Sequence, residues 1–307
     1  MYRLLLFLIG GVLLFSLNCN GPRDSWSTQG VNKLVGKGGL ITTRFESFEA
    51  FKAVVDIEYA QDRKSWVKLK HRVGNQEVVS ILAKGVSEKD IVEARDGSFW
   101  DKVGLTFRSP FFVAHRKDLL RAYGLSRRKQ LIFGEGDIAF YDLAETMKEN
   151  IHPEDVAVLT AADLSEKGFI NTFNHINAQA LMTTLFSEEV ADFIADSHER
   201  RNMPELISGK FTEAQIKDIE NGPVDNYVDI INNEWGQELG KWLKQKYQIT
   251  PRTEWTPHLL SNYLNDLQRH YSWVFQIGLS PFRSSDQIIT RFSHKINRVK
   301  KNTAGLE

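Results

Sequence analysis

The stretch DNYVDIINNEWGQELG, residues 225–240, decides the fold of the second half of the chain. Apolar side chains recur in it and just beyond it at intervals of three and four residues: Val228, Ile231, Trp235, Leu239 and Trp242. This spacing predicts one amphipathic helix that begins at Pro223. A second stripe, polar or small, runs directly alongside: Asp225, Asp229, Asn232 and Gly236. A helix built only for packing does not need that stripe, which therefore indicates a site or a polar contact between helices.

Gly236 and Gly240 stand four residues apart in the same predicted helix. Each glycine costs about 1 kcal/mol relative to alanine in a helix interior. Two arrangements could offset this cost. Either another helix approaches closely here, or a ligand occupies the space that a side chain would fill.

The preceding segments predict helices that carry polar groups in buried places. Residues 168–187, GFINTFNHINAQALMTTLFS, contain no charged side chain, and they predict a helix buried on nearly all sides. Buried polar side chains need partners, so we expect a hydrogen-bonded network around His175. The next predicted helix begins after Ser187 and places His198 at the edge of its apolar stripe, followed by Glu199.

Three segments, FNHINAQAL, HE and DIINNEWGQELG, together resemble a family of uncharacterised bacterial domains. The pattern of that family is roughly F-R-H-A-x-W, then H-E, then M-D-x-x-N-N-x-x-G-R-x-x-G. The likeness covers roughly residues 165–245, and Asn174, Ala178 and Gln237 depart from the pattern. The resemblance implies a shared site, and it implies no particular reaction.

Six residues of these segments are candidates for catalysis: His175, His198, Glu199, Asp229, Asn232 and Asn233. Imidazoles and carboxylates perform acid–base chemistry and bind divalent metals. We expect His175, His198 and Asp229 to bind an ion such as Zn²⁺ with an open position for water. The two asparagines could orient a ligand or an oxyanion. The alternative is a polar core that fixes helix register without chemistry. The sequence contains no H-E-x-x-H, G-x-S-x-G or P-loop motif.

Residues 43–150 have the composition of a strand-rich α+β region. The segments FKAVVDIEYA, SWVKLKHRV and QEVVSILAK predict strands, with a hairpin turn at Gly74–Asn75. The segments VGLTFRS, QLIFGE and DIAFYDLA are further strand candidates. With a mainly α-helical domain at 151–307, the expected class is α+β.

The N-terminus indicates export. Arg3 precedes an apolar run from Leu4 to Leu17, which is typical of a signal peptide over residues 1–18. SLNC at 16–19 resembles a bacterial lipobox, which implies lipidation of Cys19, the only cysteine. Residues 19–42 then predict a tether between lipid and folded body. The alternatives are an ordinary secretory signal or an uncleaved anchor helix. Asn20 is compatible with the outer membrane or cell surface.

The charge balance favours neither nucleic acid nor a membrane as a partner of the folded body. Lys plus Arg and Asp plus Glu both number 39. The lipid on Cys19 is therefore the expected membrane contact. Two functions remain open: a metal-assisted hydrolase of envelope or lipid material, and a non-enzymatic envelope or partner-binding lipoprotein whose polar core is structural.

Overall fold

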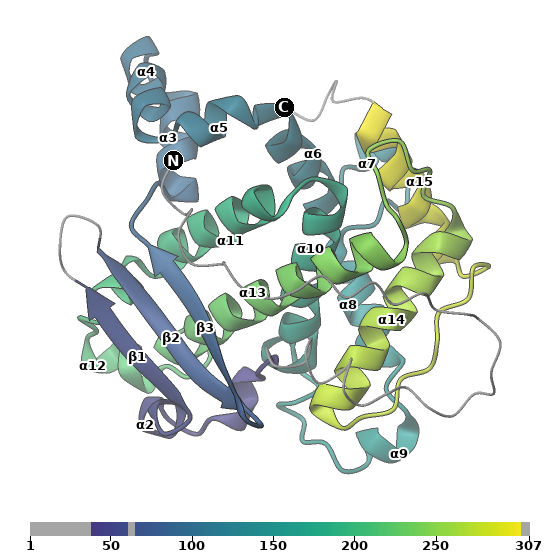
Figure 1. Cartoon of the computed structure of the whole chain (residues 1–307), viewed down its shortest axis with the longest axis horizontal. Helices are drawn as coiled ribbons and strands as arrows, with labels where there is room; N and C mark the ends of the chain where they lie inside the picture. Colours follow the sequence, from purple (N-terminus) through teal and green to yellow (C-terminus); the bar gives the residue numbers. More distant parts are fainter. Residues whose placement is uncertain (1–37, 61–64, 302–307) are drawn as a thin grey trace, which may run out of the picture. The chain divides into compact units, whose positions relative to one another are not determined.

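A small antiparallel sheet begins the folded body in the computed structural model, which describes residues 38–60 and 65–301. Strands β1 (Val55–Ala60), β2 (Trp66–Val73) and β3 (Gln76–Ala83) lie in that order (Figure 1). The register pairs Val55 with His71 and Val73 with Gln76. Gly74 turns the β2–β3 hairpin with φ of +61°, a conformation that suits glycine. The three predicted strands and their turn are confirmed.

One face of the sheet is buried because its side chains alternate between apolar and polar. Val67 and Leu69 of β2 are fully buried and point to the same side. They pack with α2 (Phe48–Lys52), η3 (Pro204–Ile207) and the first turns of α13 (Pro223–Lys246). The N-terminal turns of α13, the long helix predicted from residues 225–240, therefore pack against the sheet.

The rest of the described chain is mostly helical, so the predicted α+β class is confirmed. Besides η3, the elements between the sheet and α13 are α3 (Glu88–Asp96), α4 (Phe99–Arg108), α5 (Pro110–Ala114), α6 (Arg116–Ser126), α7 (Gln130–Phe133), α8 (Phe140–Glu149), α9 (Pro153–Val156), η2 (Glu166–Ile170), α10 (Asn171–Leu185), α11 (Glu188–Asn202) and α12 (Glu213–Lys217). After α13 come α14 (Pro257–Phe275) and α15 (Gln287–Lys301); η1 (Thr42–Arg44) precedes α2.

Three segments that we expected to be strands are helices instead. VGLTFRS lies in α4, QLIFGE in α7 and DIAFYDLA at the start of α8. A short apolar run does not distinguish a strand from a helix by periodicity. Local capping decides two of the cases: Ser98 and Asp101 form a capping box that starts α4, and the Asp142 carboxylate accepts from the Ala139 amide to start α8.

Helices α10 and α13 form the centre of the larger apolar core, into which α8, α14 and α15 also pack. Their axes approach closely because Gly236 and Gly240 have no side chain. A Cβ on Gly236 would lie 2.7 Å from the Ile176 carbonyl oxygen, and one on Gly240 would lie 2.5 Å from that of Ala180. Close helix approach, rather than room for a ligand, thus explains both glycines.

The predicted boundary at 150 does not separate two cores, because Ala122, Phe140 and Leu143 share a core with α10 and α14. Residues 38–42, which we assigned to the end of the tether, are packed against the body: Ile41 is buried and Leu40 bonds to α13. The signal peptide at 1–18, Cys19 and the tether up to residue 37 lie outside the described residues. Within the described ranges, no helix is both long and apolar enough to span a bilayer.

Candidate metal centre

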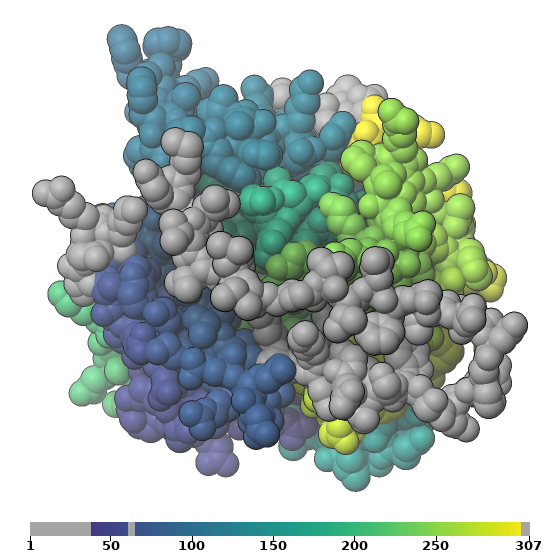
Figure 2. All heavy atoms as spheres, in the orientation of Figure 1, coloured from purple at the N-terminus to yellow at the C-terminus, as the bar shows by residue number. Residues whose placement is uncertain are grey.

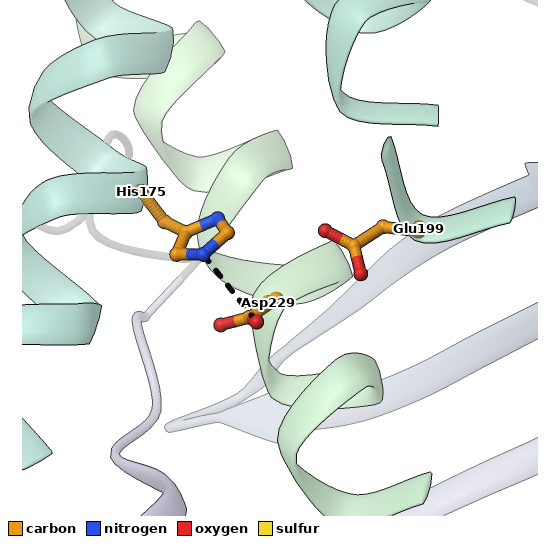
Figure 3. A group of neighbouring side chains, drawn as sticks. All are labelled: His175, Glu199 and Asp229. Atoms are coloured by element: carbon orange, nitrogen blue, oxygen red, sulfur yellow. Dashed lines mark ion pairs between the residues drawn. The ribbon is translucent and has the colours of Figure 1, made fainter. Parts of the chain in front are cut away.

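Three helices bring one imidazole and two carboxylates together. His175 comes from α10, Glu199 from α11 and Asp229 from α13, and one ligand atom of each lies within 4.8 Å of the others. Figure 3 shows the three side chains pointing toward one another from separate helices. An ion with ligand distances of about 2.0–2.6 Å has ligand atoms up to about 5 Å apart. The three groups therefore fit around one cation.

The hydrogen bond of His175 determines which of its nitrogens faces the cluster. Nδ1 lies 2.9 Å from Asn233 Oδ1, an acceptor, so a neutral imidazole carries its proton on Nδ1. The lone pair of Nε2 then points toward Asp229 Oδ2, 3.4 Å away (Figure 3). Two lone pairs that face each other repel unless a proton or a cation lies between them. A histidine that donates one N–H to an oxygen and presents its other nitrogen is the usual arrangement of a metal ligand.

Asn233 also orients Glu199. Its amide nitrogen donates to Glu199 Oε1 at 3.4 Å, a long bond, while its oxygen accepts from His175. Glu199 is only 1% exposed. Among the described residues, none is a hydrogen-bond partner of Glu199 Oε2. A buried carboxylate oxygen without a partner is costly, and a bound cation would remove that cost.

Negative charge exceeds positive charge around the cluster. Asp225 lies one helical turn before Asp229, and its Oδ2 accepts from Lys167 Nζ at 2.8 Å. Asp229 Oδ1 accepts from the neutral Asn171 amide at 2.9 Å. Three buried carboxylates, those of Glu199, Asp225 and Asp229, thus face one lysine. The excess requires protons or a cation.

Burial favours the neutral form of each group, so it lowers the pKa of the imidazole and raises the pKa of the carboxyls. Desolvation lowers the pKa of His175 to about 4, so the imidazole is neutral at pH 7. Desolvation raises the pKa of Asp229 to about 7 and, together with the Asp229 charge, that of Asp225 to about 6. The pKa of Glu199 lies well above its usual range because of desolvation and the neighbouring carboxylates. A neutral imidazole beside proton-holding carboxyls is the state that exchanges protons for a metal ion.

Solvent reaches the cluster from two places. The His175 side chain is 15% exposed, whereas that of Asp229 is 7% exposed. Glu199 also lines a pocket between β3, α11 and α13, whose other walls are Ile81, Asp192, Ala195, Asp196, Ile230, Asn233, Glu234 and Gln237. Its volume of about 10 Å³ is at the lower limit for one water molecule. The pocket can admit an ion or a water, but not a larger molecule.

Two predicted site residues lie outside the cluster. His198 Nδ1 contacts Glu88 Oε1 of α3 at 3.4 Å, and its side chain is 39% exposed. Asn232 binds the N-terminal segment: its oxygen accepts from the Leu40 amide at 2.8 Å, and its nitrogen donates to the Leu40 carbonyl at 2.9 Å. The structure therefore does not bring His198 together with His175 and Asp229 as we expected; Glu199, the next residue of α11, lies beside them instead.

Sequence reasoning missed Lys167 and the role of Asp225. Asp225 was visible as the residue one turn before Asp229, and a buried turn-spaced pair of acids needs a cation nearby. Lys167 precedes Gly168, whose non-helical backbone (φ −96°, ψ −124°) separates Lys167 from the regular turns of α10. The sequence carried no signal for that break beyond the glycine itself.

The chain was compared with family models, curated proteins and solved structures, and none of the three comparisons found a match. Any assignment of function therefore depends on the geometry of this centre.

Proposed function

We propose that His175, Glu199 and Asp229 bind a divalent cation, and that the chain is an exported lipoprotein that uses this ion in hydrolysis. One observation carries the proposal: a buried cluster holds an imidazole lone pair, an unpartnered carboxylate oxygen and more carboxylates than cations. One nitrogen and several oxygen donors suit Zn²⁺ or Mn²⁺.

Each residue has a definite task in this proposal. A bound ion would lower the pKa of a coordinated water and supply a nucleophile near neutral pH. Asn233 fixes the tautomer of His175 and the position of Glu199. Glu199, held by a single long hydrogen bond, is the carboxylate best placed to exchange a proton with a water in the adjoining pocket. Lys167 offsets part of the negative charge through Asp225.

The N-terminus supports the part of the proposal that concerns where the protein acts. The signal-like N-terminus and SLNC at 16–19 favour a chain anchored through Cys19 to the outer membrane or cell surface. No family model matches residues 165–245, so the N-terminal sequence alone supports this location. Envelope or lipid material is the corresponding substrate class.

A second function is favoured by the size of the pocket. A site with room for about one water does not accept a scissile bond without movement. A non-enzymatic envelope or partner-binding lipoprotein, in which the cluster only fixes the packing of α10, α11 and α13, agrees with that observation.

Metal content tests the site. The full chain, purified in mild detergent, is expected to retain about one Zn²⁺ or Mn²⁺ per molecule and to lose thermal stability when a chelator removes it. The variant His175→Gln should lose both effects. His270→Gln is the matched control, because burial also lowers the pKa of His270, which lies near Asp266. If the parent binds neither ion and shows no metal-dependent shift, the centre is a structural network.

Hydrolysis is tested separately on isolated cell envelopes and on phospholipid vesicles. Products should form with the metal-loaded parent, and should not form after chelation or with His175→Gln. A chain that binds metal but releases no product from either material would support the non-enzymatic function.

A further inference from the structure

A hollow lies between α15 and the turn that joins α7 to α8. Its volume of about 340 Å³ falls within the range of pockets that hold small molecules, roughly 300–1,000 Å³. One wall is a single face of α15, formed by Arg291, His294, Lys295 and Arg298, and the other is made by residues 133–137. Figure 1 shows α7 and α15 side by side, and in Figure 2 atoms of α15 (yellow) appear at the surface.

A buried ion pair makes the floor of the hollow rigid. The side chains of Lys295 and Asp137 are each only 2% exposed, and Lys295 Nζ donates to Asp137 Oδ2 at 2.9 Å. The same ammonium group donates to the carbonyl oxygens of Arg127 at 2.9 Å and Ile138 at 2.7 Å. These bonds use all three of its N–H groups. Lys295 therefore holds the turn against α15 and has no donor left for a ligand.

Two exposed arginines of the hollow do have donors to spare. Arg291 Nη1 donates to the Gly136 carbonyl oxygen at 2.9 Å, and the Arg298 guanidinium lies 5.3 Å from the centre of the Phe133 ring. A Cβ at residue 136 would overlap Arg291 Nη1, so the glycine allows this guanidinium to lie across the turn. Neither arginine forms an ion pair with any residue of the described chain. Since a guanidinium has five N–H donors, most donors of both remain available.

Positive charge predominates around the hollow after the acids are counted. Residues 116–145 and 287–301, which include α6, α7 and α15, contain 11 Lys or Arg and 5 Asp or Glu, a net charge of +6. The whole chain has 39 of each kind, so its basic residues are concentrated here. Of the two acids that line the hollow, Asp137 is paired with Lys295, which leaves Glu135 to face two arginines. The hollow therefore favours an anion.

We propose that this hollow binds the phosphate group of a small phosphorylated molecule. A phosphate monoester carries nearly two negative charges at neutral pH and has three strong acceptor oxygens. The planar guanidinium groups of Arg291 and Arg298 present paired N–H donors that match those oxygens. The hollow has the volume of a small-molecule site rather than of a single ion, so the organic part of the ligand also has room. The inference is independent of the metal centre and of the membrane location.

Calorimetric titration of the full chain in mild detergent tests the proposal with two probes. Glycerol 3-phosphate and dihexanoyl phosphatidic acid carry the same phosphate monoester without and with acyl chains. Arg291→Gln and Arg298→Gln should each weaken binding about tenfold, whereas Glu135→Gln, which removes a nearby negative charge, should strengthen it several-fold. Arg72→Gln is the matched control, because Arg72 is an exposed arginine on β2, and it should have no effect. Equal affinity for the two probes would assign the site to soluble phosphate esters, and a preference for phosphatidic acid to a lipid headgroup.

A local signal shows where the probe binds. The ring-proton resonances of His294, assigned by their loss in His294→Asn, should shift as glycerol 3-phosphate is added. The proposal is overturned if neither probe binds, if Arg291→Gln and Arg298→Gln bind as the parent does, or if Arg72→Gln weakens binding equally. It is also overturned if the His294 resonances do not move, or if His175→Gln abolishes binding, since the phosphate would then lie at the metal centre.

Discussion

Replacement of Asp229 by asparagine tests whether the buried carboxylates of the centre carry negative charge that no nearby cation neutralises. In the metal-free chain, the new side-chain amide can keep, through its oxygen, the bond that Asp229 Oδ1 accepts from Asn171. Its nitrogen takes the place of Oδ2, 3.4 Å from His175 Nε2, and can donate to that lone pair. The substitution therefore replaces a repulsive contact with a hydrogen bond and removes one buried charge. We expect it to stabilise the metal-free protein at alkaline pH and to abolish metal binding.

The size of this effect follows from the pKa of Asp229. Burial raises that pKa from 3.8 to about 7. Between these values the native chain binds more protons than the unfolded chain, so the stability of the parent falls as the pH rises. Each unit contributes up to about 1.36 kcal/mol, which gives an upper limit of about 4 kcal/mol above pH 7. Asparagine does not titrate. His175, whose pKa burial lowers to about 4, is neutral in both the folded and the unfolded chain at pH 8, so its titration does not contribute to the difference at that pH.

Urea denaturation at pH 4, 6 and 8 with a chelator measures the difference in free energy of unfolding, with tryptophan fluorescence as the signal. The advantage of Asp229→Asn should be near zero at pH 4 and about 2–4 kcal/mol at pH 8. Asp266→Asn is the control, because Asp266 is equally buried but contacts Lys246, Arg269 and the Tyr247 hydroxyl. It should lose at least about 2 kcal/mol at pH 8. A difference for Asp229→Asn that does not depend on pH, or that is destabilising at pH 8, refutes the reasoning.

Three further substitutions separate packing from chemistry. Gly240→Ala should lower the free energy of unfolding by at least about 2 kcal/mol in urea, although alanine favours helix, because its Cβ would meet the Ala180 carbonyl; a stabilised variant would contradict close approach. Asn232→Ala should lose about 1–3 kcal/mol with its two bonds to the N-terminal segment, and retain metal affinity by calorimetry. The contact with His198 lowers the pKa of Glu88 to about 2, so its stabilisation is present above pH 4.5 and disappears as the pH falls toward 2. Glu88→Gln should therefore lower the free energy of unfolding at pH 7 by no more than about 1 kcal/mol, and should leave it unchanged at pH 2.

The elements with long-range periodicity could be predicted from the sequence. The spacing from Val228 to Trp242 and the proline at 223 placed α13, and the uncharged stretch 168–187 placed α10 as a buried helix. The expected network around His175 exists because a buried imidazole must bond to something, and Asn233 is that partner. These predictions depend only on the spacing of apolar residues along the chain and on the free-energy cost of burying a polar group without a partner.

The face of α11 that points into the core could not be predicted from the sequence, because the large apolar residues of the helix lie on other faces. Phe193 packs toward α4 and α5, and Ile194 is only partly buried. The face toward the core carries small residues at intervals of four, Ala191 and Ala195, and the next position on it is Glu199. Periodicity based on large side chains therefore placed His198 at the core edge, about 100° from the true face.

Neighbouring positions on α13 perform separate tasks because each successive side chain points about 100° further around the helix. Asn232 holds the backbone of Leu40, while Asn233 holds His175 and Glu199. Gly236, one turn after Asn232, meets the carbonyl oxygen of Ile176, the residue that follows His175. The same close approach that the glycine permits therefore sets how far His175 stands from α13. Packing and chemistry are coupled at this point: the helix contact that stabilises the core also fixes the distance between the imidazole and Asp229, and a centre with a fixed distance binds an ion without reorganisation.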